Sequence, residues 1–396
     1  MQSIQPFLLD EWLRENEPKC HLFLQGSSAG SHSIDSLKGL TPDSTRDPID
    51  RSLALTYGKS LGFDSLRKRI AELHSSKEVT LTTSNAVITS GSISANYLAL
   101  STVLNSGDHV ICQYPTYGQI YELPKHFGVE VSLWKSTAER NWIPDLKDLA
   151  SLVRPNTKAI LITNPCNPTG TVLRRDMLDG IITVAKQHHL ILFADEVFRP
   201  LFHSPNEEHP PSVVAMGYQK TICTSSLSKA HGLSGIRVGW VVSPDPQIMK
   251  QIVVARDYTT VSVSQLDQCV AMFALSPEVL PRLMDVNLER CAKGIALLDG
   301  FVRENSKWCQ WVPPAGAGVG FIRICKENGD PIDDADFCGR LASERGICVV
   351  PAGHSFTGDD KDDLKGYVRL PLGDWQELKQ GLPVVASFLA SYMAKT

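Results

Sequence analysis

The stretch that says most about the fold reads SSLSKAHGLSGIRVGW and covers residues 225–240. It follows the apolar run Lys220–Ser225, which is typical of a strand buried in a sheet. Most lysines are solvated surface residues, but packing alone poorly explains Lys229, which stands among hydroxyls and glycines just after that run. The glycines indicate a backbone that passes close to another group, and they are Gly232, Gly235 and Gly239.

Two kinds of side chain suggest the chemistry of this stretch. Ser226, Ser228 and Arg237 supply hydrogen-bond donors that suit a phosphate group. The amine of Lys229, placed beside such donors, can form an imine with an aldehyde. The stretch therefore predicts a site for a phosphorylated aldehyde cofactor.

Further apolar runs bounded by Gly, Pro or Asn predict a set of buried strands. These lie at residues 86–90, 109–113, 159–163, 190–194, 220–225 and 238–243. Helical periodicity appears between several of them, as in Ser94–Leu104 and Arg175–Gln187. Strands that alternate with helices predict a mostly parallel sheet covered on both faces, with its ligand at the carboxyl ends of the strands.

Polar residues follow three of the predicted strands at the ends where a ligand would lie. Residues 164–170 read NPCNPTG, for which a simple turn and a functional loop are equally good interpretations. Asp195 ends a very apolar run, so it needs a cationic partner, a helix to cap or an internal salt bridge. Ser92 and Ile93 follow a Gly-containing turn at the start of a helix, where backbone N–H groups can bind phosphate.

The rest of the chain predicts a smaller second lobe. A long helical pattern begins near residue 285, followed by strands at 318–324, 347–351 and 367–370 and helices at 334–344 and 375–393. Residues 27–50 are rich in Ser, Gly, Asp and Pro and predict an irregular arm. We therefore expect an N-terminal arm with part of the small domain at 1–50, a large cofactor-binding domain at 51–284 and a small α+β domain at 285–396.

Composition excludes several functional classes. The 396 residues carry a formal net charge of −4, so no overall basic field favours nucleic acid or an anionic membrane. No run approaches the roughly 18 apolar residues of a membrane span, and the start lacks a signal-peptide pattern. The ten cysteines are dispersed and form no C-x-x-C pair, which predicts reduced core thiols and a cytoplasmic location. The histidines show no metal-ligand spacing, so we expect no metal.

From Tyr57 to Gly373 the sequence resembles the fold-type I pyridoxal-phosphate-dependent enzymes of the class I/II aminotransferase superfamily. The resemblance rests on the S-x-S-K-x-x-G-L-x-G-x-R-x-G pattern and on N-P-x-N-P-T-G, which occur in family order with Asp195-Glu196 between them. It implies an aspartate-aminotransferase-like α/β fold, with a mostly parallel seven-stranded sheet in the large domain and a smaller α+β C-terminal domain.

The resemblance also implies roles for individual residues. Three are implied to be catalytic: Lys229 as the Schiff-base lysine and the acid/base at Cα, Asp195 as partner of the pyridine nitrogen, and Tyr117 stacked on the ring. The other implied cofactor-binding residues are Ser92, Ile93, Asn167, Phe198, Ser226, Ser228, Arg237 and, from a neighbouring subunit of a homodimer, Tyr57. The implied substrate-binding residues are Arg369 (a clamp for the α-carboxylate), Asn167, Gly26 and Ser27.

Two departures from the family pattern leave the reaction open. The family usually has tyrosine where this chain has Phe198, and that tyrosine donates a hydrogen bond to the phenolic oxygen of the cofactor. Its absence is expected to raise the pKa of the lysine–cofactor imine, unless another residue compensates. The opening residues 8–13 and the Ser-Gly-rich arm are similar to capreomycidine synthase-like members.

Three hypotheses for the function follow. The first is an aminotransferase that converts an L-α-amino acid to a 2-oxo acid through pyridoxamine phosphate. The second keeps the cofactor but predicts β/γ-elimination, replacement or cyclisation of an amino acid. A third, a non-catalytic ligand sensor, is disfavoured because Lys229, Asp195 and Arg237 are all present. Spacing alone does not identify the amino acid substrate, the acceptor or the pathway.

Overall fold

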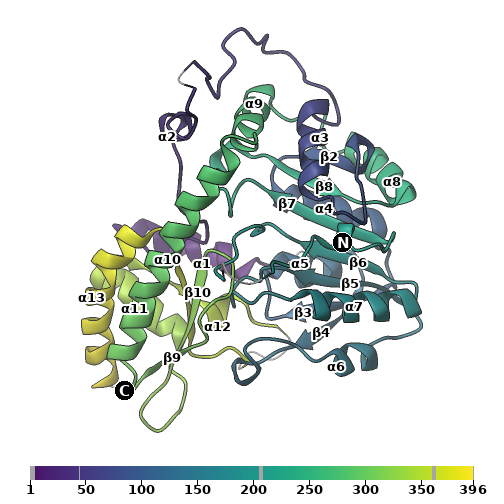
Figure 1. Ribbon diagram of the computed structural model, residues 1–396. Helices are drawn as coiled ribbons and strands as arrows, with labels where there is room; N and C mark the ends of the chain where they lie inside the picture. Colours follow the sequence, from purple (N-terminus) through teal and green to yellow (C-terminus); the bar gives the residue numbers. More distant parts are fainter. Residues whose placement is uncertain (1–4, 44, 205–207, 359–362, 396) are drawn as a thin grey trace.

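The structure is a computed structural model that describes residues 5–43, 45–204, 208–358 and 363–395. Figure 1 shows two lobes joined by the long helix α10 (Leu280–Glu304), which runs from the upper part of the large lobe along the small one. The other helices are α1 (Leu8–Asn16), α2 (Ile34–Lys38), α3 (Asp64–Leu73), α4 (Ser92–Val103), α5 (Gly118–His126), α6 (Leu146–Ser151), α7 (Arg175–Gln187), α8 (Pro246–Asp257), α9 (Gln265–Ala274), α11 (Asp334–Arg345), α12 (Ala352–Ser355) and α13 (Trp375–Met393).

The large lobe is built on a seven-stranded sheet in the order β2-β8-β7-β6-β5-β3-β4. Only β8 runs antiparallel to its neighbours, so the predicted mostly parallel seven-stranded sheet is confirmed. The strands are β2 (Ala86–Thr89), β3 (His109–Tyr114), β4 (Glu130–Lys135), β5 (Thr157–Thr163), β6 (Ile191–Asp195), β7 (Thr221–Ser226) and β8 (Gly239–Val242).

One strand of this sheet was absent from the sequence prediction. β4 reads EVSLWK and lies at the edge of the sheet next to β3, with both of its end residues exposed. The prediction looked for continuous apolar runs, which suit strands covered on both faces. An edge strand with a charged residue at each end does not have that pattern, so it was missed.

The apolar patterns explain why sheet and helices pack together. In α7 the residues Leu178, Ile181, Ile182 and Ala185 follow helical spacing and are all buried. Burial of each such large aliphatic side chain stabilises the fold by roughly 1.5–3 kcal/mol. The apolar face of α7 therefore fixes this helix on the sheet, as its sequence predicted.

The small lobe contains a four-stranded antiparallel sheet in the order β12-β13-β10-β9. Its strands are β9 (Cys309–Trp311), β10 (Val319–Ile324), β12 (Val350–Pro351) and β13 (Tyr367–Pro371). The strand predicted at 347–351 is divided, because β11 (Ile347–Cys348) pairs instead with β1 (Leu22–Phe23) near the N-terminus. An α+β lobe is thus present, while the exact domain boundaries at 50 and 284 stay a prediction.

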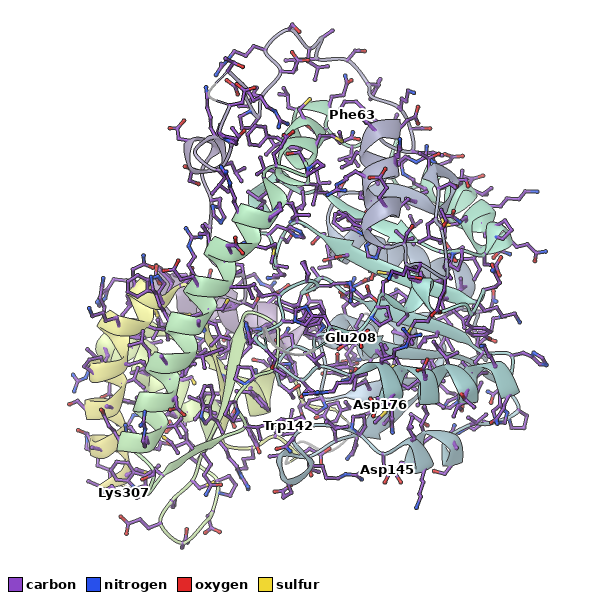
Figure 2. All side chains as sticks on the ribbon, in the orientation of Figure 1. Phe63, Trp142, Asp145, Asp176, Glu208 and Lys307 are labelled. Atoms are coloured by element: carbon purple, nitrogen blue, oxygen red, sulfur yellow. The ribbon has the colours of Figure 1, made fainter. Side chains whose placement is uncertain are left out.

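Trp142 connects the two lobes. This residue of the large lobe is 3% exposed and packs edge-on against Phe321 and Tyr367, with ring centroids 5.4 Å away in both cases. Phe321 and Tyr367 lie on β10 and β13 of the small sheet. Figure 2 labels Trp142 at the junction of the lobes, where this aromatic cluster packs the two lobes against each other.

The described residues include no helix that is both long and apolar enough to span a membrane. All ten cysteines are free thiols, and eight of them are buried.

Candidate active site

A cavity of about 300 Å³ lies where the carboxyl ends of β5, β6 and β7 face the small lobe. Most of the residues singled out from sequence line it: Gly26, Ser27, Ser92, Ile93, Tyr117, Asn167, Asp195, Phe198, Ser228, Lys229, Arg237 and Arg369. Its other lining residues are Leu9, Asp10, Leu13, Gln25, Thr163, Val197 and Ser234. Motifs almost 350 residues apart in the chain therefore meet around one space.

Lys229 follows β7 and places its amine inside the cavity. Its Nζ donates a hydrogen bond to Ser27 Oγ at 2.9 Å. Burial, with the positive charges of Arg369 and Arg237, lowers the pKa of Lys229 to about 8. An amine with this pKa is partly neutral near neutral pH, so it can attack a carbonyl or accept a proton.

Asp195 ends β6 and is only 3% exposed. Asn96 donates to its Oδ2 at 2.9 Å, and the backbone N–H of Val197 donates to its Oδ1 at 3.0 Å. Burial raises the pKa of Asp195 to about 6, although these hydrogen bonds oppose the shift. None of the described residues forms an ion pair with this carboxylate, so a cation from a ligand would complete its environment.

The opposite corner of the cavity is suited to an anion. Arg237 donates to Ser228 Oγ at 3.2 Å and to Ser234 O at 2.8 Å, and no acid among the described residues pairs with it. The helix α4 begins here at Ser92, so the first backbone N–H groups of the helix have no partner within it. Ser226 lies just behind, with its Oγ 3.4 Å from Ser92 Oγ. A guanidinium, hydroxyls and a helix N-terminus are together suited to bind a phosphate.

The glycines of the 225–240 stretch are explained in part by close approach. A Cβ at Gly239 would overlap the backbone of Gly91 and Ser92, and a Cβ at Gly232 would overlap the carbonyl of Gly30. The prediction was wrong for Gly235, where a Cβ would meet nothing within 4 Å.

Arg369 projects from β13 into the cavity and is 3% exposed. It donates to Asn167 Oδ1 at 3.2 Å and to the backbone oxygen of Gln25 at 2.5 Å, while its Nε has no partner. Burial lowers the pKa of Arg369 to about 10. A buried guanidinium with an unused N–H and no acidic partner in the described chain fits a carboxylate ligand.

These four charged positions fit pyridoxal 5′-phosphate and an amino acid. The corner at Arg237 suits the phosphate, Asp195 suits a protonated ring nitrogen, and Lys229 suits the aldehyde. Tyr117 lies at the start of α5 on the cavity wall, where Phe7 packs edge-on against its ring at 5.3 Å. Arg369 then remains available for the substrate. The individual roles stay proposals, but the site can hold the whole set.

Phe198 and Tyr57, both predicted to bind the cofactor, differ from the other predicted residues in what they offer the cavity. Phe198 lines the cavity and is 2% exposed, but it packs in a small apolar cluster with Val197, Ala317 and Val319 and offers no donor. Tyr57 lies outside the cavity and is 78% exposed, so within a single chain it does not join the site.

Sequence reasoning missed residues that complete the site. Asn96 orients its amide by accepting from Thr224 Oγ1 at 2.5 Å, which directs its nitrogen toward Asp195. A sequence signal was present, since Asn96 is the one polar residue among the buried residues of α4. Asp10 and Gln25 gave no comparable signal, because only tertiary packing brings them to the cavity.

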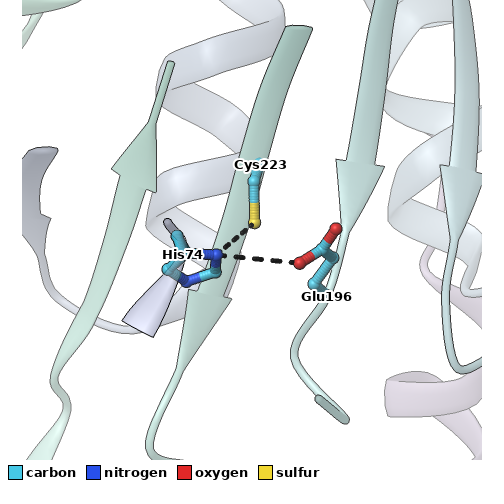
Figure 3. A group of neighbouring side chains, drawn as sticks. All are labelled: His74, Glu196 and Cys223. Atoms are coloured by element: carbon cyan, nitrogen blue, oxygen red, sulfur yellow. Dashed lines mark hydrogen bonds and ion pairs between the residues drawn. The ribbon is translucent and has the colours of Figure 1, made fainter. Parts of the chain in front are cut away.

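A second polar cluster lies deep in the large lobe and is drawn in Figure 3. His74 Nδ1 is 3.8 Å from both Glu196 Oε2 and Cys223 Sγ, and all three residues are buried. The indole N–H of Trp240 donates to His74 Nε2 at 3.0 Å, so the proton of the neutral ring resides on Nδ1. Burial lowers the pKa of His74 to about 3, which keeps the ring neutral. Nδ1 is therefore a hydrogen-bond donor toward its neighbours, and a metal at Nδ1 would leave two N–H groups facing each other at Nε2.

Comparisons with known proteins agree with this geometry. The family model for aminotransferase class I and II matches residues 41–382. Capreomycidine synthase of Streptomyces vinaceus is 28% identical over 99% of this chain and 95% of its own length, and aspartate aminotransferase of Thermotoga maritima is 28% identical over 83% and 81%. A crystal structure of a PLP-dependent aminotransferase from Streptococcus suis superposes with a TM-score of 0.87, at 31% identity over 99% of both chains. The chain therefore belongs to the class I and II aminotransferase family.

Proposed function

We propose that this protein is a pyridoxal-phosphate-dependent aminotransferase that converts an L-α-amino acid to a 2-oxo acid. The observation that carries the proposal is the buried guanidinium of Arg369, which has a free Nε and shares one cavity with Lys229. When bound, the cofactor provides a sink for the electron pair released from a bond at Cα.

The residues of the chain then divide the remaining work. Arg369 holds the α-carboxylate and so fixes which bond at Cα points away from the ring plane. Lys229, with a pKa of about 8, would take the proton from Cα onto its Nζ and would release it to the former aldehyde carbon of the cofactor, which the substrate nitrogen separates from Cα. Asp195 keeps the ring nitrogen protonated, because a negative charge beside it favours the charged form. Tyr117, on the cavity wall, would cover one face of the ring.

A second candidate function is elimination, replacement or cyclisation at the amino acid side chain. Phe198 favours it, since the cavity lacks a hydroxyl donor at that wall. The similarity to capreomycidine synthase over 99% of the chain points in the same direction. Both functions use Lys229, Asp195 and Arg369 and differ in which bond breaks after the Cα proton has left.

We also propose a homodimer with shared active sites in the cytoplasm. Leu55, Tyr57, Tyr258 and Val261 are between 66% and 91% exposed, which leaves apolar surface uncovered around the 51–63 segment. A second copy that covers this surface would bring its Tyr57 toward the phosphate corner. Sedimentation at micromolar concentration tests the assembly, and a monomer would contradict it.

One experiment separates the candidate functions. Single L-amino acids are added to the cofactor-loaded protein without any 2-oxo acid, while the visible band of the cofactor is recorded. Loss of the band with one equivalent each of 2-oxo acid and pyridoxamine phosphate establishes transamination. A band that recovers while product accumulates over many turnovers establishes the second function. A Lys229→Ala protein serves as control, and an unmodified protein that shows no cofactor band would overturn the proposal.

A further inference from the structure

A second cavity, of about 250 Å³, lies between the lobes and shares no lining residue with the active-site cavity. The large lobe contributes Trp142 and part of the short 3-10 helix Ala138–Arg140 to its walls, and the small lobe contributes residues of β9, β10 and β13. Figure 2 labels Trp142 at this junction. None of the residues proposed to bind the cofactor or the α-carboxylate lines this space, so it is a separate cavity.

Arg323, on β10, supplies the one positive charge among the described residues of this lining. Its Nε is buried without a hydrogen-bond partner, and no acid in the described chain forms an ion pair with its guanidinium. Glu139 is the one acid of the same set, and it is exposed. Hydrogen bonds from Thr137 and from its own backbone N–H lower the pKa of Glu139 more than the distant charge of Arg323 does. A guanidinium with an unused N–H and no acidic partner is suited to an anion from a ligand.

Aromatic side chains form much of the remaining wall, namely Trp142, Trp311 and Tyr367. Trp142 adopts a φ of 59°, which is uncommon for a bulky residue, and its packing against Phe321 and Tyr367 fixes the indole in place. The Cζ of Arg323 lies 5.8 Å from the ring centroid of Tyr367. A ligand in this cavity would therefore meet flat apolar walls and one cation.

The register of the small sheet keeps the two cavities apart. β10 pairs with β13 so that Phe321 lies opposite Arg369 and Arg323 lies opposite Tyr367. Opposite residues, and residues two apart along a strand, share one face of a sheet, so both arginines lie on the face that packs on the large lobe. The rings of Phe321 and Tyr367 stack with centroids 4.5 Å apart on the diagonal between the two arginines, and both are buried. Each guanidinium therefore serves its own cavity.

We propose that the second cavity binds a small aromatic carboxylate, distinct from both the cofactor and the amino acid substrate. The carboxylate pairs with Arg323, and the ring packs against Trp142 and Trp311. The cavity is slightly smaller than the roughly 300–1,000 Å³ typical of ligand pockets, which favours a ligand with a single ring. One cation and one acid in the described lining suit a monoanion better than a phosphate. Both lobes contact this ligand, so it bridges them whichever reaction the active site catalyses.

The test measures the binding of phenylacetate to the cofactor-loaded protein by calorimetry. Phenylacetate carries a ring and a carboxylate but no amino group, so it cannot react as an amino acid substrate. Phenylacetamide keeps the shape without the charge, and acetate keeps the charge without the ring. For a ligand of this size we expect a dissociation constant on the order of 1 mM. Loss of the charge-assisted hydrogen bond, or of the buried ring, should weaken binding at least about 10-fold in either control compound.

Three variants assign the binding to Arg323. Arg323→Gln removes the charge and should weaken phenylacetate binding at least about 10-fold, while the visible band of the bound cofactor shows that the protein is still folded and loaded. Arg369→Met, at the active site, should keep the binding. Arg303→Gln changes an exposed arginine of α10 outside both cavities and should leave the dissociation constant as it was.

Three results would overturn the inference. The first is phenylacetate that binds no more tightly than acetate or phenylacetamide. The second is an Arg323→Gln protein that binds phenylacetate as tightly as the unmodified protein, or no more weakly than Arg303→Gln. The third is loss of binding in Arg369→Met alone, which would place phenylacetate in the active-site cavity. None of these results depends on 2-oxo acid formation, so this inference and the proposed function fail separately.

Discussion

Replacing Arg369 with methionine should make the protein more stable and much less active. The guanidinium is buried without an acidic partner, and its pKa falls from the ordinary arginine value to about 10. That fall corresponds to about 3 kcal/mol of free energy spent on keeping the charge in the folded state. Methionine fills similar volume without the charge, but it leaves Asn167 Oδ1 and Gln25 O without their donor, at a cost of about 1 kcal/mol each. The net gain for the cofactor-free protein is about 1 kcal/mol.

The catalytic effect should have the opposite sign. Removing one partner of a desolvated guanidinium–carboxylate pair costs roughly 2–5 kcal/mol, so kcat/KM for the amino acid should fall by about 30-fold or more. The assays are urea unfolding of the cofactor-free protein and initial rates of 2-oxo acid formation. Arg256→Met is a matched control, since Arg256 is also buried without an acidic partner but lies outside the cavity. An Arg369→Met protein that unfolds at lower urea and retains its kcat/KM would refute the reasoning.

Three further predictions concern neighbouring parts of the molecule. Because burial lowers the folded-state pKa of His74 to about 3, the folded protein binds fewer protons than the unfolded chain between that pH and about 6.5. Stability therefore falls as the pH is lowered through this window. His74→Gln should flatten this fall by up to about 1.4 kcal/mol per pH unit, and an unchanged slope of unfolding free energy against pH contradicts the prediction. Phe198→Tyr adds a hydrogen-bond donor at the cavity wall and should lower the pKa of the lysine–cofactor imine, which is followed by the visible band of the loaded protein. A titration curve identical to that of the unmodified protein would contradict this prediction. Gly239→Ala pushes a Cβ into the start of α4 and should cost about 1–3 kcal/mol and weaken cofactor binding, whereas Gly235→Ala meets nothing and should do neither; equilibrium dialysis and urea unfolding of both variants decide.

The sequence alone was enough to predict those strands, helices and site residues that are marked by a local sequence pattern. Buried strands β5, β6 and β7 are apolar runs that stop at a polar residue, so the residues after them could be assigned to one edge of one sheet. Helix α7 was also predictable with its bounds, since its apolar spacing is regular. The edge strand β4 and the division of residues 347–351 were not, because both depend on which neighbour is available for pairing.

The hydrogen-bond partners of the site residues were harder to predict from the sequence than the site residues themselves. Asp195 was identified from its position after a buried run, but the support from Asn96 required the packing of α4 under β7. The cluster of His74, Glu196 and Cys223 shows the same limit, since nothing in their spacing brings them together. Even there the chemistry is decided by a fourth residue, because Trp240 fixes the tautomer of the histidine.

Residues that bind the cofactor are therefore easier to predict from a sequence than residues that bind the substrate. The residues proposed to hold the cofactor mainly follow strands of one sheet, and this arrangement leaves long motifs such as that at 225–240. The other walls of the cavity come from opposite ends of the chain, because Arg369 lies on β13 and Leu9, Asp10 and Leu13 lie on α1. A single residue on a short helix can change the charge of that wall without disturbing any motif. Relatives that share every cofactor residue can thus differ in substrate.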